Sequence, residues 1–243
     1  MKLPLVPVLG LGAALGLSAF LRSVGFYDFT AREADGLGML IQLVGDIYAV
    51  LLAFVIFVIW GQFTEVENCV MRECSSLDEI SRLSRYLDAD SHANIRRALT
   101  GYATHVIRSE WDALGDGRPD AQADPIFSKL LTSVVESVPR TDEQRLIQAR
   151  LIDSAQKAGE RRHERVSKSL TRIPPTLAAL VKTIAALLLL LVFVYPFRQW
   201  STGACGLVMV AALLFLANLV MVDTDNPLKG IWNVSSAPFG AIR

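Results

Sequence analysis

Two kinds of hydrophobic pattern alternate along this chain. Four stretches stay apolar over about twenty residues, whereas the long segment between the second and third repeats apolar residues among charged ones. A helix needs about 20 predominantly apolar residues to cross the hydrocarbon core of a bilayer. The sequence therefore predicts four transmembrane helices, at Leu3–Leu21, Gly38–Trp60, Thr176–Phe197 and Gly203–Val222. The first apolar run exceeds the ~7–15 residues of a signal-peptide core, so we expect it to be retained as a span.

The second span is expected to continue into water as one helix. No proline separates Gly38–Trp60 from the amphipathic segment Thr64–Leu87, and the intervening Gly61 costs a helix only about 1 kcal/mol. Apolar residues in the amphipathic segment recur at the spacing of a packed helical face. This predicted buried face consists of Val66, Val70, Leu77, Ile80 and Leu87.

The rest of the segment between spans two and three also has helical signals. Three further helices are expected: from an N-cap at Ser91 to Leu114 (Ile95, Leu99, Tyr102 and Val106 inward), from an N-cap at Asp124 to before Pro139, and from a capping box at Thr141 towards Arg172. Pro174 and Pro175 then prevent smooth continuation into the third span.

These elements predict an all-α protein with four transmembrane helices and a cytosolic helical bundle inserted between spans two and three. The expected divisions are a transmembrane hairpin at residues 1–60, the bundle at 61–173, a second hairpin at 174–222 and a cytosolic tail at 223–243. The tail is too short and too interrupted by Pro and Gly to span a membrane, so we expect it to lie along the membrane face or the bundle.

The distribution of charge, more than its sum, indicates orientation. Lys plus Arg and Asp plus Glu number 24 each, so net charge points to no partner. Basic residues cluster just before the third span, and the positive-inside rule therefore places the insert in the cytoplasm. Four crossings place both termini there too. We expect the protein to lie in the plasma (inner) membrane. The cluster consists of Arg161, Arg162, Arg165, Lys168 and Arg172. Because Glu160 and Glu164 are interspersed, it indicates a solvated or lipid-facing helix and not a nucleic-acid site.

The second span contains the candidate functional residues. Asp46 is an acid inside a predicted span, and such a costly placement indicates a function unless packing neutralises it. At about 100° per residue, several polar and small residues lie within about 40° of Asp46 around the helix. We call this set the span-two stripe: Gln42, Asp46, Ala53, Phe57, Trp60 and Thr64. It lines either a water-filled path or a helix–helix contact, and the opposite side, with Val44, Leu51, Val55 and Ile59, is expected to face lipid.

Other chemistry has weaker support. Asp223, Asp225 and Asn226 follow the fourth span and offer oxygens to a cation, but such residues before a proline favour turn chemistry. Cys69, Cys74 and Cys205 have no spacing typical of a zinc site or disulfide frame. No cofactor or metal is predicted. No nucleophile motif indicates an enzyme. An enzyme acting on lipid would need a pocket with paired acidic side chains, for which Asp223 and Asp225 are the candidates.

A family resemblance extends from the second span to the tail. Its motifs are Tyr48-Ala-Val-Leu-Leu-Ala-Phe54, Trp60-Gly-Gln-Phe63, Glu67, Val70, Glu73, Tyr102, Glu110-Trp111, Arg162–Arg165, Pro174-Pro175, Asp225-Asn-Pro227 and Gly230. In residue type and spacing, these motifs resemble the bestrophin-like family of bacterial four-span membrane proteins. The resemblance covers most of the chain from about Gly38.

The resemblance implies an ion channel. The family is named for a distant similarity to bestrophins, which are pentameric chloride channels whose second transmembrane helix lines the pore. It implies a homo-oligomer, a pentamer by resemblance, whose partners are the lipid bilayer and inorganic ions, with chloride favoured and no nucleic acid. The span-two stripe would line the pore, and Phe57 and Trp60 would form its apolar constriction.

Asp46 does not fit a simple anion pore, because an ionised carboxylate repels anions. We expect Asp46 to be a neutral hydrogen-bonding group; otherwise it faces a neighbouring helix or the pathway passes cations. A membrane-anchored helical scaffold or sensor without conduction is the alternative, because the mixed-charge insert fits it equally well.

Overall fold

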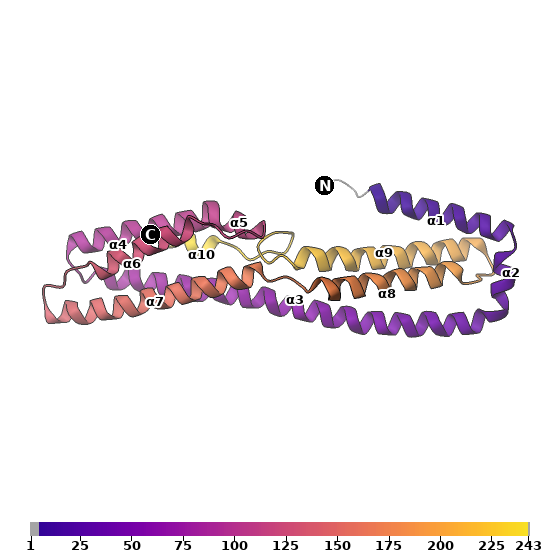
Figure 1. The fold of residues 1–243 in the computed structure, drawn as a ribbon, viewed down its shortest axis with the longest axis horizontal. Coiled ribbons are helices and arrows are strands. Elements are labelled where there is room, and N and C mark those ends of the chain that lie inside the picture. The colour runs from indigo at the N-terminus through magenta and orange to yellow at the C-terminus, as the bar shows by residue number, and fades with distance from the viewer. Residues whose placement is uncertain (1–4, 243) are drawn as a thin grey trace. The chain divides into compact units, whose positions relative to one another are not determined.

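The computed structural model describes residues 5–242, with side chains from residue 12 onwards, and its regular elements are helices (Figure 1). In chain order they are α1 (Leu5–Ser23), α2 (Phe26–Thr30), the 3-10 helix η1 (Ala31–Glu33), α3 (Ala34–Ser84), α4 (Ala89–His105), the π-helix η2 (Val106–Glu110), α5 (Trp111–Gly115), α6 (Ala123–Val135), α7 (Asp142–Leu170), α8 (Pro175–Val194), α9 (Trp200–Thr224) and α10 (Ala237–Gly240). No strand occurs among the described residues, which confirms the all-α prediction.

The chain divides into two compact units. Unit 1 consists of Met1–Val58 and Ile173–Val222, and unit 2 consists of Ile59–Arg172 and Asp223–Arg243. Each unit is therefore built from two separate parts of the chain, and the α3 helix contributes residues to both.

Unit 1 holds the apolar helices. Three helical stretches among the described residues are long and apolar enough to cross a membrane: Phe26–Ser84, Asp142–Val194 and Trp200–Thr224. They contain the predicted second and fourth spans and the predicted third span up to Val194, three residues before its expected end at Phe197. The predicted first span begins at Leu3, outside the described residues, and coincides from Leu5 onwards with α1, which is not among these three stretches.

Polar contacts join the two helical hairpins of unit 1 at one end. Tyr27 in α2 donates its hydroxyl to the carbonyl oxygen of Phe193 at 3.0 Å. Arg22 near the end of α1 donates to the carbonyl oxygen of Arg198 at 2.8 Å. These contacts connect α1 and α2 with the end of α8 and the turn that follows it.

The α3 helix runs without a break from Ala34 to Ser84, through Gly61. The prediction that the second span continues as a single helix is therefore confirmed, although the helix ends three residues before Leu87. All five residues of the predicted buried face, from Val66 to Leu87, are buried.

Unit 2 is a bundle closed by the C-terminal tail. Within it α4 packs against α6, α6 packs against α7, and α10 packs against α4. The core receives side chains from α3, α4, η2, α6 and α7, including Ile95, Leu99, Tyr102 and Val106 as predicted. The tail adds Leu228, Val234, Phe239 and Ile242 to the same core. Of the two placements expected for the tail, the bundle is the one observed.

The caps of the bundle helices follow the predictions in part. Thr141 is the N-cap of α7 and accepts a hydrogen bond from the backbone N–H of Gln144 at 3.2 Å, as predicted. Two other predicted N-caps are wrong. Asp88 caps α4 by accepting from the N–H of Ser91, and α6 begins at Ala123 with Gln122 before it. Several polar residues lie close together at these helix starts, and N-cap preferences alone do not determine which of them caps the helix.

Candidate functional site

The span-two stripe is exposed along most of its length. Gln42, Asp46 and Ala53 are exposed, and the side chains of Phe57 and Trp60 are 76% and 50% exposed. Thr64 is half-buried, and its hydroxyl donates to the carbonyl oxygen of Trp60 at 3.0 Å. Few other side chains of the chain pack against this side of α3.

The opposite side of α3 corrects a prediction. Val55 and Ile59 were expected to face lipid, but they are 0% and 2% exposed, and Val44 and Leu51 are half-buried. This side therefore packs inside the chain. Hydropathy does not separate the two environments, because lipid tails are as apolar as a leucine-lined helix contact.

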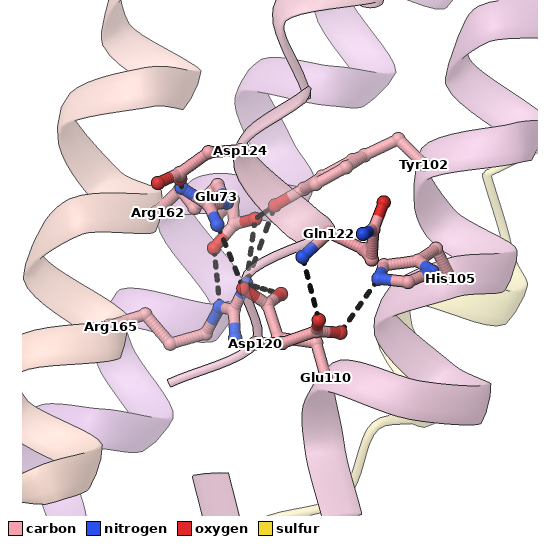
Figure 2. A network of polar contacts seen from close by, with 9 residues as sticks. All are labelled: Glu73, Tyr102, His105, Glu110, Asp120, Gln122, Asp124, Arg162 and Arg165. Atoms are coloured by element: carbon pink, nitrogen blue, oxygen red, sulfur yellow. Dashed lines mark hydrogen bonds and ion pairs between the residues drawn. The ribbon is translucent and has the colours of Figure 1, made fainter. Parts of the chain in front are cut away.

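A buried charge network lies inside unit 2, around Arg165 of α7 (Figure 2). Arg165 donates from Nε to Glu73 Oε2 at 2.6 Å and from Nη2 to Glu110 Oε2 at 2.8 Å. All three side chains are at most 1% exposed. The network therefore joins α3, α7 and the η2 segment by charge-assisted hydrogen bonds, which are stronger than neutral ones.

Arg162 and Tyr102 complete this network. Arg162 donates from Nη2 to Glu110 Oε1 at 3.0 Å and also bonds the exposed carboxylate of Asp124. Tyr102 of α4 donates its hydroxyl to Glu73. Burial, followed by the nearby charge of Glu73, raises the pKa of Tyr102 well above its ordinary value. The phenol therefore stays neutral and serves as a donor.

A wide helical turn brings Glu110 into the network. In an unbroken α-helix, at about 100° per residue, Glu110 would lie about 80° from Tyr102 around the axis. The π-helical segment Val106–Glu110 changes this registration, and Glu110 is buried together with Tyr102. Single π-turns of this kind often occur at functional positions in helices.

Aromatic rings close the other sides of Arg165. Its guanidinium carbon lies 5.9 Å from the ring centre of Trp111 and 5.4 Å from that of Phe239, which belongs to the C-terminal tail. The Nη1 atom of Arg165 is buried and has no hydrogen-bond partner among the described residues. The electron-rich faces of the two rings attract the guanidinium charge. The tail thus contributes directly to the surroundings of the buried charge.

A smaller pair braces the loop before α6. The Nε2 atom of His105, at the end of α4, lies 2.7 Å from Asp120 Oδ2 (Figure 2). The other oxygen of Asp120 accepts from the backbone N–H of Gln122 at 2.9 Å. This pair fixes the path of the chain between α5 and α6.

The network also corrects the expected role of the basic cluster. Arg165 was expected on a solvated or lipid-facing helix, but it is fully buried, and the Arg162 side chain is only 11% exposed. One sequence signal could have revealed this arrangement. Glu73 lies between Val70 and Leu77 on the predicted buried face of α3, so a charge there requires a buried partner.

The side-chain oxygens of Asp223 and Asn226, after the predicted fourth span, accept hydrogen bonds from the backbone of a turn. Asp223 accepts from the backbone N–H of Ile231 at 3.0 and 3.1 Å. Asn226 accepts from the N–H of Leu228 at 3.2 Å and donates to the carbonyl oxygen of Gly115 at 2.8 Å. The residues described by the structure contain no group of three or more His, Cys, Asp or Glu side chains that could hold a metal ion. Asp223 and Asn226 therefore act in turn chemistry, and Asp225 lies between them.

Comparisons with known proteins agree with the resemblance predicted from sequence. The chain resembles the crystal structure of a bacterial Bestrophin homolog from Klebsiella pneumoniae with a TM-score of 0.65 and 11% identity, covering 94% of each chain. It resembles a point variant of that homolog with a TM-score of 0.67 and 12% identity, covering 96% of each chain. At this identity the likeness concerns the fold. No match was found among curated proteins. The family model of the Bestrophin-like domain matches residues 12–239, and the chain therefore belongs to the Bestrophin-like family.

Proposed function

We propose that copies of this chain assemble in the plasma (inner) membrane as an ion channel whose pathway is lined by the span-two stripe. The observation that carries the proposal is the sidedness of α3. Its apolar side at Val55 and Ile59 is buried in the chain, and its side with Gln42 and Asp46 is exposed. Polar groups facing lipid at this depth are costly, whereas the same groups around a shared axis can face water.

The proposed topology has four crossings and both termini in the cytoplasm. In it α1 is the first span, the apolar part of α3 the second, α8 the third and α9 the fourth. Unit 2 lies in the cytoplasm, as the basic residues Lys168 and Arg172 before α8 favour. Family membership supports this arrangement.

The narrow part of the pathway is assigned to Phe57 and Trp60. Both are large, exposed apolar side chains on the stripe, one turn apart. Rings of such side chains can close a pore to ions by excluding water. Gln42, Asp46, Ala53 and Thr64 line the wider parts. A preference for anions, chloride above all, rests on the resemblance to bestrophin channels.

The proposal is tested by planar-bilayer recordings of the purified protein and Phe57→Ala. Removal of the ring is expected to raise single-channel conductance or open probability, because the pore becomes wider and wetter. Phe54→Ala is a matched control. It removes the same kind of ring from an exposed position on α3, about 60° from Phe57 around the helix.

Two results would contradict the proposal. The first is the absence of current from well-folded protein in bilayers, which would favour a membrane-anchored scaffold or sensor. The second is equal current from the wild type, Phe57→Ala and Phe54→Ala, which would remove the span-two stripe from the pathway.

A further inference from the structure

The chain after the fourth span forms a firmly held loop, residues 223–234, which we call the C-terminal loop. The backbone N–H of Val234 donates to the carbonyl oxygen of Pro227 at 2.8 Å and closes the loop. Asn226 bonds to Gly115 at 2.8 Å, and Lys229 forms an ion pair with Asp116. Hydrogen bonds from Lys229 and Arg118 hold the pKa of Asp116 below its ordinary value. The base of the loop is therefore tied to the end of α5.

Asp223 and Gly230 determine where the tip of the loop points. The Asp223 carboxylate accepts from the N–H groups of Ile231 and, at 3.4 Å, Trp232. Gly230 has a φ of 116°, and a Cβ atom there would lie 2.7 Å from Asp223 Oδ1. A side chain at residue 230 therefore requires both a strained backbone and displacement of the carboxylate that holds the tip.

This fixed tip presents two large apolar side chains. Ile231 is 78% exposed and Trp232 is 58% exposed. The Trp232 ring meets the ring of Trp60 edge-on, with 5.9 Å between centroids and 73° between planes. Trp60 in turn stacks on Phe63 at 5.9 Å. A ring from the end of the chain thus extends the aromatic end of the span-two stripe.

We propose that Trp232 lines the cytosolic mouth of the ion pathway beside Trp60, and that the C-terminal loop sets the width of this mouth. The inference rests on the proposed function, because it places Trp232 in the ion pathway that Trp60 is proposed to line. Trp60 lies on the side of α3 that carries Gln42 and Asp46, and these polar groups favour water over lipid on that side. A ring held edge-on to Trp60 shares this water-facing side.

Recordings of loop variants in planar bilayers test this assignment. Trp232→Ala is expected to raise single-channel conductance or open probability by about twofold or more, in the same direction as Trp60→Ala, because both widen one apolar ring. The double variant is expected to gain less than the two single gains combined, because residues in contact do not act independently. Ile231→Ala is the matched control, since it removes a more exposed apolar side chain from the same loop.

Gly230→Ala provides a second route to the same result. It keeps both tryptophans and displaces the tip that Asp223 holds. Its conductance or open probability is expected to change as for Trp232→Ala, and a wild-type value would show that the position of the loop does not matter.

Fluorescence quenching adds a readout that does not depend on current. The difference in emission between the wild type and Trp232→Phe in liposomes isolates the signal of Trp232. Iodide in the water phase is expected to quench this signal, and brominated lipid is expected to leave it unchanged. Quenching by brominated lipid would place Trp232 at the lipid interface and overturn the assignment.

The outcomes separate the two proposals. If the wild type conducts and Phe57→Ala alters the current, but Trp232→Ala behaves like the wild type or like Ile231→Ala, the channel proposal stands and the role of Trp232 is wrong. If well-folded wild type carries no current, the channel proposal is wrong and the inference fails with it.

Discussion

At the scale of the residue, Glu73 is a charge of α3 that is fully buried beside Arg165. Glu73→Gln leaves the Arg165 guanidinium buried without its nearest counter-charge, and we expect the free energy of unfolding to fall by about 3–5 kcal/mol. Glu79→Gln makes the same change on the same helix. Its partner Arg150 is largely exposed, so the expected loss is at most about 1 kcal/mol. Denaturant unfolding of both variants in detergent measures the difference, and equal losses would contradict it.

The charge state of Asp46 determines whether the proposed pore favours anions or cations. We expect it to act mainly as a neutral hydrogen-bonding group, because the carboxylates of several copies around one axis repel one another. Asp46→Asn should then preserve assembly and leave ion selectivity nearly unchanged at neutral pH. Reversal potentials of both forms at pH 5 and pH 8 measure this. A large shift towards anions in Asp46→Asn at pH 8 would show instead that Asp46 is ionised in a wide, wet vestibule.

At the scale of the element, two glycines have opposite roles. Gly61 lies within α3, and, apart from its chain neighbours and the nearby helix backbone, no atom of the described residues lies within 4 Å of an added Cβ. Gly61→Ala should therefore raise the free energy of unfolding by up to about 1 kcal/mol. Gly230 has a positive φ and no room beside Asp223, so Gly230→Ala should lower it by about 1–3 kcal/mol. Thermal unfolding of the two variants compares them directly. A destabilising Gly61→Ala would indicate that α3 needs flexibility or close contact there.

At the scale of the whole molecule, the exposed side of α3 carries polar groups that are costly to place in lipid. We expect the purified protein to be a homo-oligomer, a pentamer by resemblance, in which the span-two stripes of the copies surround one axis. Native mass spectrometry in detergent measures the number of copies. Monomer alone, under conditions in which the protein stays folded, would contradict the assembly, and ordered lipid along the axis would favour a scaffold over a channel.

Local patterns were sufficient to predict the helices and several of their features. The apolar lengths of predicted spans two to four, the uninterrupted α3 through Gly61, the N-cap at Thr141 and the interruption between α7 and α8 at Pro174 were predictable. Each depends on hydrogen bonds and side-chain spacing within a few turns of helix. The buried face from Val66 to Leu87 was predictable for the same reason.

Contacts between distant parts of the chain account for what those patterns missed. Val55 and Ile59 are buried, and Arg165 is enclosed by Glu73, Glu110 and a ring from the tail. An apolar side chain in a membrane helix is satisfied by lipid or by another helix, so its composition does not show which it meets. A buried charge is stable only beside its partners, and these partners lie between 55 and 92 residues away in sequence. Local periodicity therefore shows that α3 has two sides, and long-range packing settles which of them the chain covers.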